Sequence, residues 1–256
     1  TEKNNDKFIY LKKFNSKILK IKFKNLFICC GPINSPSLLL KNKLIKNEKN
    51  DRSFEFHINF KIVVKFKDEI NSNKSTSGVY FMREFEDEGA LLSSAYSELN
   101  YILATLSHFD DKIKRDVIDN YNKIGFYVYQ IKANSRGEIN IFLGKEYVKY
   151  KFDNFDLLQI QKAITRSASL FFSADAEYIL YPIQDSGKIT SPKKAVEITE
   201  NINPQKLHLV SVHGMSSLHH SNNRFSKTNY NGKLNNFNNI YINDASILPS
   251  NFGESP

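Results

Sequence analysis

The chain has 256 residues, of which 41% are hydrophobic, 25% charged and 13% aromatic. This balance is ordinary for a globular protein and excludes a disordered chain, a collagen-like chain and a small scaffold that depends on disulfides. Residues 1–52 contain 13 Lys or Arg and four Asp or Glu side chains, so they carry the whole formal net charge of +9.

The basic first segment has two interpretations. Clustered lysines can attract nucleic acid or another anionic partner. However, the lysines from Lys20 to Lys24 alternate with apolar residues, which predicts a half-buried strand over 17–23 with one lysine-rich face in solvent. We therefore expect no nucleic acid among the partners. No apolar run approaches the roughly 18 residues that span a bilayer, so we also expect no integral membrane segment.

Residues 25–30 form a short apolar run that predicts a second, fully buried strand. It contains the only two cysteines, Cys29 and Cys30. Neighbouring cysteines on a strand point to opposite faces, so a disulfide between them would be strained. We interpret both as small core residues in a reducing compartment. The opening also lacks the apolar region of a signal peptide, and together these features predict a cytoplasmic location.

Gly31 and Pro32 end this strand, and Ser35 followed by Pro36 predicts the start of a helix over 37–45, with Ser35 as N-cap. The apolar residues of 54–69 alternate as in a long strand or a hairpin. The apolar spacing over 91–109 is close to 3.6 and predicts a helix. Further strands are expected at 79–85, 125–131, 139–142, 147–152, 176–182, 207–212 and 240–242, helices at 110–121 and 156–172, and loops at 71–77 and 221–239.

Three stretches contain residues that can carry chemistry. In the first, residues 30–40, a strand, a tight glycine turn and a helix N-terminus follow one another. Helix N-termini bind anions through free N–H groups. The alternative is an ordinary connection between a strand and a helix.

The second stretch is residues 212–220, where His213 follows a predicted strand. Histidine titrates near neutrality and can accept a hydroxyl proton. The alternative is a packed or surface histidine. His219 and His220 suggest a metal, but adjacent histidines rarely converge on one ion and no carboxylate lies at helical spacing from them, so we expect no metal site.

The third stretch is residues 239–250, where a buried strand ends in Asp244. A carboxylate at a strand end can accept hydrogen bonds from ligand hydroxyls. The alternative is that Asp244 caps a turn or helix.

Taken in order, the three stretches resemble one family, the glucose–methanol–choline (GMC) oxidoreductases. Residues 31–40, Gly-Pro-Ile-Asn-Ser-Pro-Ser-Leu-Leu-Leu, are similar to its Gly-Ala-Ile-x-Ser/Thr-Pro-x-Leu-Leu-Leu signature. Residues 213–217 are similar to its His-x-x-Gly-Thr/Ser segment. Residues 239–250, Asn-Ile-Tyr-Ile-Asn-Asp-Ala-Ser-Ile-Leu-Pro-Ser, resemble its Asn-Leu-Tyr-Val-x-Asp-Ala-Ser-Val-Phe-Pro-Thr segment, which is the longest and most specific match.

The resemblance implies an α+β fold in which a partial α/β FAD-binding domain carries an inserted substrate domain, built on a mostly antiparallel sheet flanked by helices. It assigns residues 1–50 and 206–256 to the FAD-binding domain and residues 51–205 to the substrate-binding domain. It further implies FAD as cofactor and oxidation of a small alcohol, such as a sugar or polyol, with an unknown electron acceptor.

The resemblance also implies roles for individual residues. His213 matches the family base at the reactive edge of the flavin, and Ser255 stands where the family has a second active-site residue, Asn or His. The implied cofactor-binding residues are Gly31, Ser35, Asp244, Ala245 and Gly253.

The chain departs from the family pattern at several points. Ser216 replaces the glycine of the histidine segment, and Ser255 replaces Asn or His. The dinucleotide fingerprint Gly-x-Gly-x-x-Gly does not occur, so we expect a fragment of a longer protein that is inactive alone. The alternative function is a non-catalytic binding protein that uses the basic N-terminal segment to engage an anionic partner.

Overall fold

The computed structural model describes residues 7–12, 17–46, 53–74, 80–200, 202–220 and 227–253. The chain forms two compact units. Unit 1 comprises Thr1–Phe54, Glu138–Lys149 and Gly214–Ser250, and unit 2 comprises Glu55–Gly137, Tyr150–His213 and Asn251–Pro256. Helices and strands occur together in an α+β fold, as the sequence predicted.

Unit 1 is built around a pair of parallel strands. β3 (Leu26–Ile28) pairs with β12 (Ile240–Ile242), and Leu26 lies opposite Ile240. The helix α1 (Gly31–Lys41) follows β3 after two residues. The buried side chains that join α1 to the strands form one cluster, which consists of Ile28, Leu39, Leu218, Leu234, Ile240 and Ile242.

Unit 1 also contains two antiparallel hairpins. β1 (Lys7–Lys12) pairs antiparallel with β2 (Ile18–Phe23), and β8 (Gly137–Phe142) pairs with β9 (Lys145–Lys149). The expected strand over 17–23 is therefore present, but it is not half-buried. Ile18 is 67% exposed and Ile21 42% exposed, because both faces of the hairpin lack a covering layer among the described residues.

Unit 2 contains an antiparallel sheet with a long central strand, β4 (Ser53–Phe66). One edge of β4 pairs with β7 (Ile124–Lys132), which continues to β6 (Ala90–Ser94) and β5 (Phe81–Met82). Residues 63–66 of β4 also pair with β10 (Ala176–Leu180).

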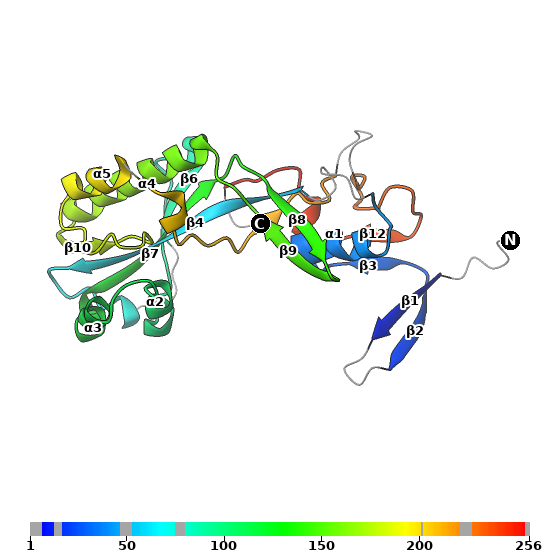
Figure 1. The fold of residues 1–256 in the computed structure, drawn as a ribbon, viewed down its shortest axis with the longest axis horizontal. Helices are drawn as coiled ribbons and strands as arrows, with labels where there is room; N and C mark the ends of the chain where they lie inside the picture. The colour runs from blue at the N-terminus through cyan, green and yellow to red at the C-terminus, as the bar shows by residue number, and fades with distance from the viewer. Residues whose placement is uncertain are drawn as a thin grey trace. The chain divides into compact units, whose positions relative to one another are not determined.

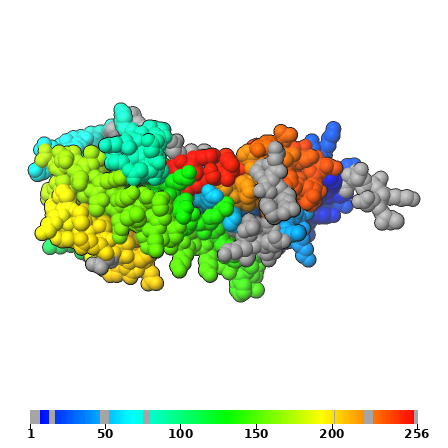
Figure 2. Space-filling view, turned by 90° about the horizontal axis from the view of Figure 1, so that it is seen from above, coloured from blue at the N-terminus to red at the C-terminus, as the bar shows by residue number. Residues whose placement is uncertain are grey.

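Helices cover both faces of the unit 2 sheet (Figure 1). α2 (Leu99–Thr105) and α3 (Asp111–Asp119) lie on one face, where Ile102 and Val117 pack against Val63. α4 (Asn154–Ser173) lies on the other face, and α5 (Pro192–Glu200) packs beside it, as the adjoining yellow-green and yellow segments of Figure 2 show. Alternation along β4 produces both apolar faces.

Several elements follow the sequence prediction closely. β4, β7, β8, β10 and β12 lie where strands were expected, and α3 and α4 lie where helices were expected. Asp110 and Asp153 cap α3 and α4 by accepting hydrogen bonds from the backbone N–H groups of Ile113 and Asp156. Such caps satisfy N–H groups that the helix itself leaves unpaired.

Other predictions were wrong. The stretch 91–109 is not one helix, because its first residues belong to β6 and pair with β7, and only α2 is helical. The strand expected over 79–85 is reduced to β5. α1 begins at Gly31 rather than at residue 37, so Ser35 lies inside the helix and does not cap it. The strand 207–212 is replaced by isolated bridges at Leu207 and Val210, and α5 was not predicted.

The prediction that the two cysteines are core residues was also wrong. Cys29 and Cys30 are both exposed and free, because the strand β3 ends at Ile28 and the chain turns towards α1. They are therefore not core residues. The predicted loops at 71–77 and 221–239 fall partly outside the described residues. Within the part of the chain that the structure describes, no helix is long and apolar enough to cross a membrane.

Candidate functional site

The polar residues of unit 1 gather where its two parallel strands end. β3 and β12 run in the same direction, so their carboxyl ends meet at one edge. Gly31 follows the end of β3 and Asp244 follows the end of β12. Ligands of α/β proteins commonly bind at such edges, in front of the strand ends.

The Asp244 carboxylate accepts four hydrogen bonds from the chain itself. Its Oδ2 accepts from the Gly31 backbone N–H at 2.9 Å and from the Ser35 hydroxyl at 2.5 Å. Its Oδ1 accepts from the backbone N–H and the hydroxyl of Ser246, at 2.9 Å and 2.5 Å. A carboxylate offers about four lone-pair positions, so Asp244 is fully occupied. It holds the start of α1 beside the turn at Ala245–Ile247.

Gly31 is the first residue of α1 and has φ +84°. A side chain at this position would be strained by the backbone conformation and not by crowding, since a Cβ atom there would meet no atom within 4 Å. The Ser35 hydroxyl, besides donating to Asp244, accepts from the backbone N–H of Cys30 at 3.1 Å. Four predicted site residues are thus brought together in unit 1: Gly31, Ser35, Asp244 and Ala245.

Gly253, the fifth predicted cofactor-binding residue, belongs to unit 2. It has φ +80°, and a Cβ atom there would lie 3.2 Å from Cβ of Lys132. Its position is fixed by Asn251, which is 1% exposed. The Asn251 amide donates to the backbone carbonyls of Phe56 and Ala133, and its Oδ1 accepts from the Gly253 N–H at 2.8 Å.

Ser255, the second predicted catalytic residue, lies outside the described residues, as does Pro256.

His213 is half-buried at the end of the segment that follows α5 in unit 2. Its Nδ1 lies 2.9 Å from Nε2 of His57, which is fully buried on β4. The two rings meet edge to face at 69° with centroids 4.8 Å apart. The backbone supports this contact, because Asn59 and Val210 exchange both of their N–H···O=C hydrogen bonds and thereby tie the segment before His213 to β4.

The surroundings of His213 favour its neutral form. Burial lowers the pKa of His213, and the positive charge of Lys61 lowers it further. Burial in turn lowers the pKa of Lys61, which has no hydrogen-bonded or ion-paired partner among the described residues. A neutral imidazole can accept a proton, so His213 is suited to act as a base.

Sequence reasoning missed His57, Asn59, Lys61 and Asn251. The first three alternate along β4, and residues two apart on a strand share one face. Within an alternating strand, a single histidine indicates nothing about a second histidine that contacts it from 156 positions away. Asn251 lies in a short polar stretch with no motif of its own.

The other histidine candidates are part of the local structure of unit 1. The Nδ1 of His220 bonds the backbone carbonyl of Ile247 at 2.9 Å, and its ring contacts Tyr230. Across the described ranges, no group of three or more His, Cys, Asp or Glu side chains is placed to bind a metal ion.

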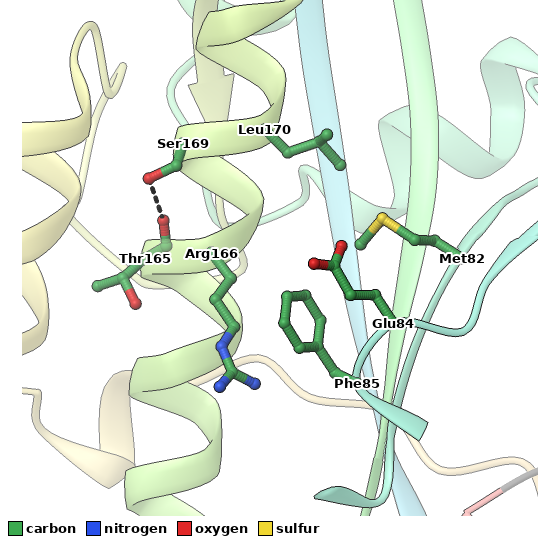
Figure 3. Close-up of a pocket in the computed structure, with 7 residues that line it drawn as sticks. All are labelled: Met82, Glu84, Phe85, Thr165, Arg166, Ser169 and Leu170. Carbon is green, nitrogen blue, oxygen red and sulfur yellow. Dashed lines mark hydrogen bonds between the residues drawn. The ribbon is translucent and has the colours of Figure 1, made fainter. Parts of the chain in front are cut away.

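A surface pocket of about 340 Å³ lies on unit 2, between α4 and the segment that contains β5. Figure 3 shows Arg166 and Leu170 of α4 across from Met82 and Phe85. The Arg166 guanidinium lies 4.1 Å from the Phe85 ring centroid and 2.8 Å from the Glu88 carboxylate, so its charge is already paired. None of the predicted site residues lines this pocket.

Comparison with known proteins gives matches over nearly the whole chain. An uncharacterised GMC-type oxidoreductase of Sinorhizobium fredii is 20% identical over 242 residues, which are 93% of this chain and 47% of that protein. An uncharacterised GMC-type oxidoreductase of Mycobacterium tuberculosis is 19% identical over 225 residues, which are 87% of this chain and 36% of that protein. No family model matches the chain. The chain therefore spans less than half the length of these curated relatives.

Solved structures share the fold. Pyridoxine 4-oxidase from Mesorbium loti matches with a TM-score of 0.66 and 14% identity, covering 100% of this chain and 52% of that one. An FAD-dependent oxidoreductase from Chaetomium thermophilum matches with a TM-score of 0.52 and 11% identity, covering 94% of this chain and 54% of that one. At these identities the likeness establishes the fold.

Proposed function

We propose that this chain, which belongs to the GMC oxidoreductase family, forms part of an FAD-dependent enzyme that oxidises the CH–OH group of a small alcohol. An oxidoreductase function follows from the family, and the alcohol substrate is our proposal. The observation that carries it is the pairing of a half-buried His213 with a fully buried His57, since His213 is the residue that matches the base of the family.

We assign the two parts of the reaction to different segments. Residues 1–50 and 206–256 contribute to the FAD-binding domain, and residues 51–205 form the substrate-binding domain. The parallel pair of β3 and β12 in unit 1 supports the first assignment, because nucleotide-binding domains are built on parallel strands. The antiparallel sheet of unit 2 supports the second.

The residues of unit 1 fit one part of a flavin nucleotide. The N-terminus of α1 carries a partial positive charge. Asp244 takes the Gly31 N–H and Pro32 has none, but the open space at Gly31 allows a ligand to approach the backbone closely. Asp244 and Ser35 hold this N-terminus in place. Because its four acceptor positions are occupied, Asp244 acts on the cofactor through the backbone that it orients, and Ala245 follows it in the same turn.

His213 handles the substrate proton. FAD, when bound, supplies the acceptor for the hydride that leaves the carbinol carbon with the electron pair of its C–H bond. The hydroxyl proton moves to Nε2 of His213, because Nδ1 is engaged with His57. The substrate thereby becomes a carbonyl compound. Ser255 is assigned a hydrogen bond to the substrate oxygen, since a serine hydroxyl can donate but is not a base at neutral pH.

The experiment is anaerobic flavin reduction by the intact flavoprotein with a panel of small alcohols, compared between wild type and His213→Ala. Loss of a positioned base lowers such a rate by about 10²–10⁴-fold. Flavin content should stay the same, because His213 is assigned to the substrate. His208→Ala is the matched control, since this exposed histidine of unit 2 stacks on His108 and does not contact His213.

Two results would refute the proposal. One is an intact protein that does not bind FAD. The other is a His213→Ala variant that reduces its flavin with alcohol at the wild-type rate.

A further inference from the structure

His57 of unit 2 contacts His213 directly, and neither the family motif nor the sequence pattern marks it. It is 0% exposed, and it sits on the central strand of the sheet. The bonds between Asn59 and Val210 hold the two backbones in register beside it, at 2.8 Å and 3.0 Å. His57 therefore presents its Nε2 to His213 from a rigid position.

The 2.9 Å separation between His57 Nε2 and His213 Nδ1 limits where hydrogen can be. Two nitrogens this close form a hydrogen bond only if one carries hydrogen and the other accepts it. The pair therefore holds one hydrogen between the rings. If that hydrogen is on His213 Nδ1, then His213 Nε2 carries no hydrogen in the neutral ring and can take a proton, while neutral His57 carries its own hydrogen on its buried Nδ1. If it is on His57 Nε2, then His213 Nε2 carries hydrogen and cannot act as a base.

Positively charged neighbours make it unfavourable for the His57–His213 pair to take up an additional proton. Lys61 lies on the same face of β4, and Lys132 is the cross-strand partner of His57 on β7. The carboxylate closest in sequence, Glu55, is committed elsewhere, because it binds Arg136 at 2.8 Å and the backbone N–H of Asn251 at 2.7 Å. The histidine pair is therefore surrounded by two cations and by a carboxylate that is already ion-paired. These surroundings favour the neutral form of both imidazoles.

We propose that His57 is a positioning residue whose Nε2 accepts a hydrogen bond from Nδ1–H of His213. This contact fixes His213 in the tautomer whose Nε2 carries no hydrogen. The proposal deepens the proposed function, because it names the residue that prepares the base. The contact also holds the imidazole ring at one angle, and it strengthens when His213 becomes an imidazolium, since a charged donor makes the stronger bond.

The test that needs no mutation is ¹⁵N NMR of the histidine side chains in the 256-residue chain above neutral pH. The chain has six histidines, and the His213→Ala spectrum assigns His213 by difference. We expect His213 to carry hydrogen on Nδ1 and none on Nε2. Hydrogen on Nε2 of His213 in the neutral protein would overturn the proposal.

Variants test the dependence on His57. In His57→Gln, the side-chain oxygen can accept the same hydrogen bond, so the His213 tautomer should stay fixed. In His57→Phe no acceptor remains, so both tautomers should appear. His208→Gln is the control and should leave the His213 signals unchanged. A folded His57→Phe variant with the wild-type tautomer would refute the proposal. If that variant does not fold, the wild-type and His57→Gln spectra decide.

Kinetics of the intact flavoprotein separate this inference from the proposed function. His57→Phe should slow flavin reduction by roughly 10–100-fold, by analogy with the loss of groups that orient metal-bound histidines. His57→Gln should restore most of the rate, and KM should change little. If the NMR result holds but His213→Ala keeps its rate, the proposed function fails and the His57–His213 contact stands. If the tautomer is independent of His57 while His213→Ala is inactive, only the inference fails.

Discussion

The Asp244 carboxylate and the Gly31 backbone N–H lie 2.9 Å apart, although 213 positions separate the two residues. The same carboxylate binds Ser35 and Ser246, so one side chain joins the start of α1 to the turn after β12. A carboxylate at a helix N-terminus is favoured by the partial positive charge there. Asp244 is therefore a structural element of unit 1, whatever ligand the edge binds.

Asp244→Ala should lower the free energy of unfolding by about 1–3 kcal/mol, because it leaves the Gly31 N–H and the Ser35 hydroxyl without their acceptor. Urea denaturation of the chain measures this. The control is Asp175→Asn, which removes an exposed charge that pairs with Lys67, keeps a residue type that tolerates the positive φ of this position, and should change stability little. Equal losses in the two variants would contradict the role of Asp244.

Ser216→Gly should stabilise the chain. Ser216 has φ +63°, and its buried hydroxyl has no hydrogen-bond partner among the described residues; it stands where the matching family segment has glycine. Glycine removes about 1–2 kcal/mol of backbone strain and the unpaired hydroxyl, and it costs about 0.5–1 kcal/mol of chain entropy. A net gain of about 1 kcal/mol should appear in a denaturation curve.

The neighbouring Ser217→Gly is the matched control. Ser217 is also buried, and within the part of the chain that the structure describes its hydroxyl has no hydrogen-bond partner, but its φ is not positive. The glycine entropy then has no strain relief to offset it, so this variant should be less stable than Ser216→Gly. If both substitutions had the same effect, the backbone of Ser216 would not be strained.

Lys61→Met should shift the pH dependence of the enzyme. Burial and the Lys61 charge both lower the pKa of His213, so His213 stays neutral to lower pH than an ordinary histidine. Because the neutral form is the base, kcat/KM falls only as pH drops through this lowered pKa. Removing the charge raises the pKa of His213, so the acid limb of the pH profile should move to higher pH.

Lys67→Met is the control for this shift, since Lys67 is exposed and pairs with Asp175. Titration of the His213 NMR signals in the chain itself provides a readout that does not depend on turnover. An acid limb at the same pH in Lys61→Met and wild type would show that the Lys61 charge does not reach His213.

The 256-residue chain alone should bind FAD more weakly than micromolar. The sequence contains no Gly-x-Gly-x-x-Gly turn to cradle the pyrophosphate. Equilibrium dialysis measures the affinity directly. Tight binding would mean that the chain carries a complete flavin site.

Sequence patterns predicted the elements whose stabilising contacts are local. α3 and α4 have capping aspartates within one turn of their starts, and the long alternation of β4 is unmistakable. The stretch 91–109 misled because Leu91 and Leu92 fit a helical spacing equally well. Their pairing with Gln130 and Tyr129 of β7 decided the outcome, and no local pattern reports such pairing.

In the candidate site, too, the sequence could indicate residues within contiguous motifs but not their partners from distant parts of the chain. His213, Gly31 and Asp244 belong to contiguous motifs, so the sequence could indicate them. Their partners could not be indicated, because the contact between His57 and His213 spans 156 positions and depends on the tertiary fold. Cys29 and Cys30 were misjudged for a related reason, since an apolar neighbourhood in the sequence did not translate into burial.

Asn251 has a consequence for the order in which the protein is made. Its side chain and backbone bind Glu55, Phe56 and Ala133, which are synthesised more than a hundred residues earlier. The polypeptide enters unit 2 in three separate passes, and the last pass begins at Asn251. Unit 2 therefore cannot complete its hydrogen bonds on the ribosome until translation of these 256 residues is nearly finished. Until then the backbone carbonyls of Phe56 and Ala133 lack the hydrogen bonds that Asn251 donates, so this end of the sheet is the last part of unit 2 to be completed.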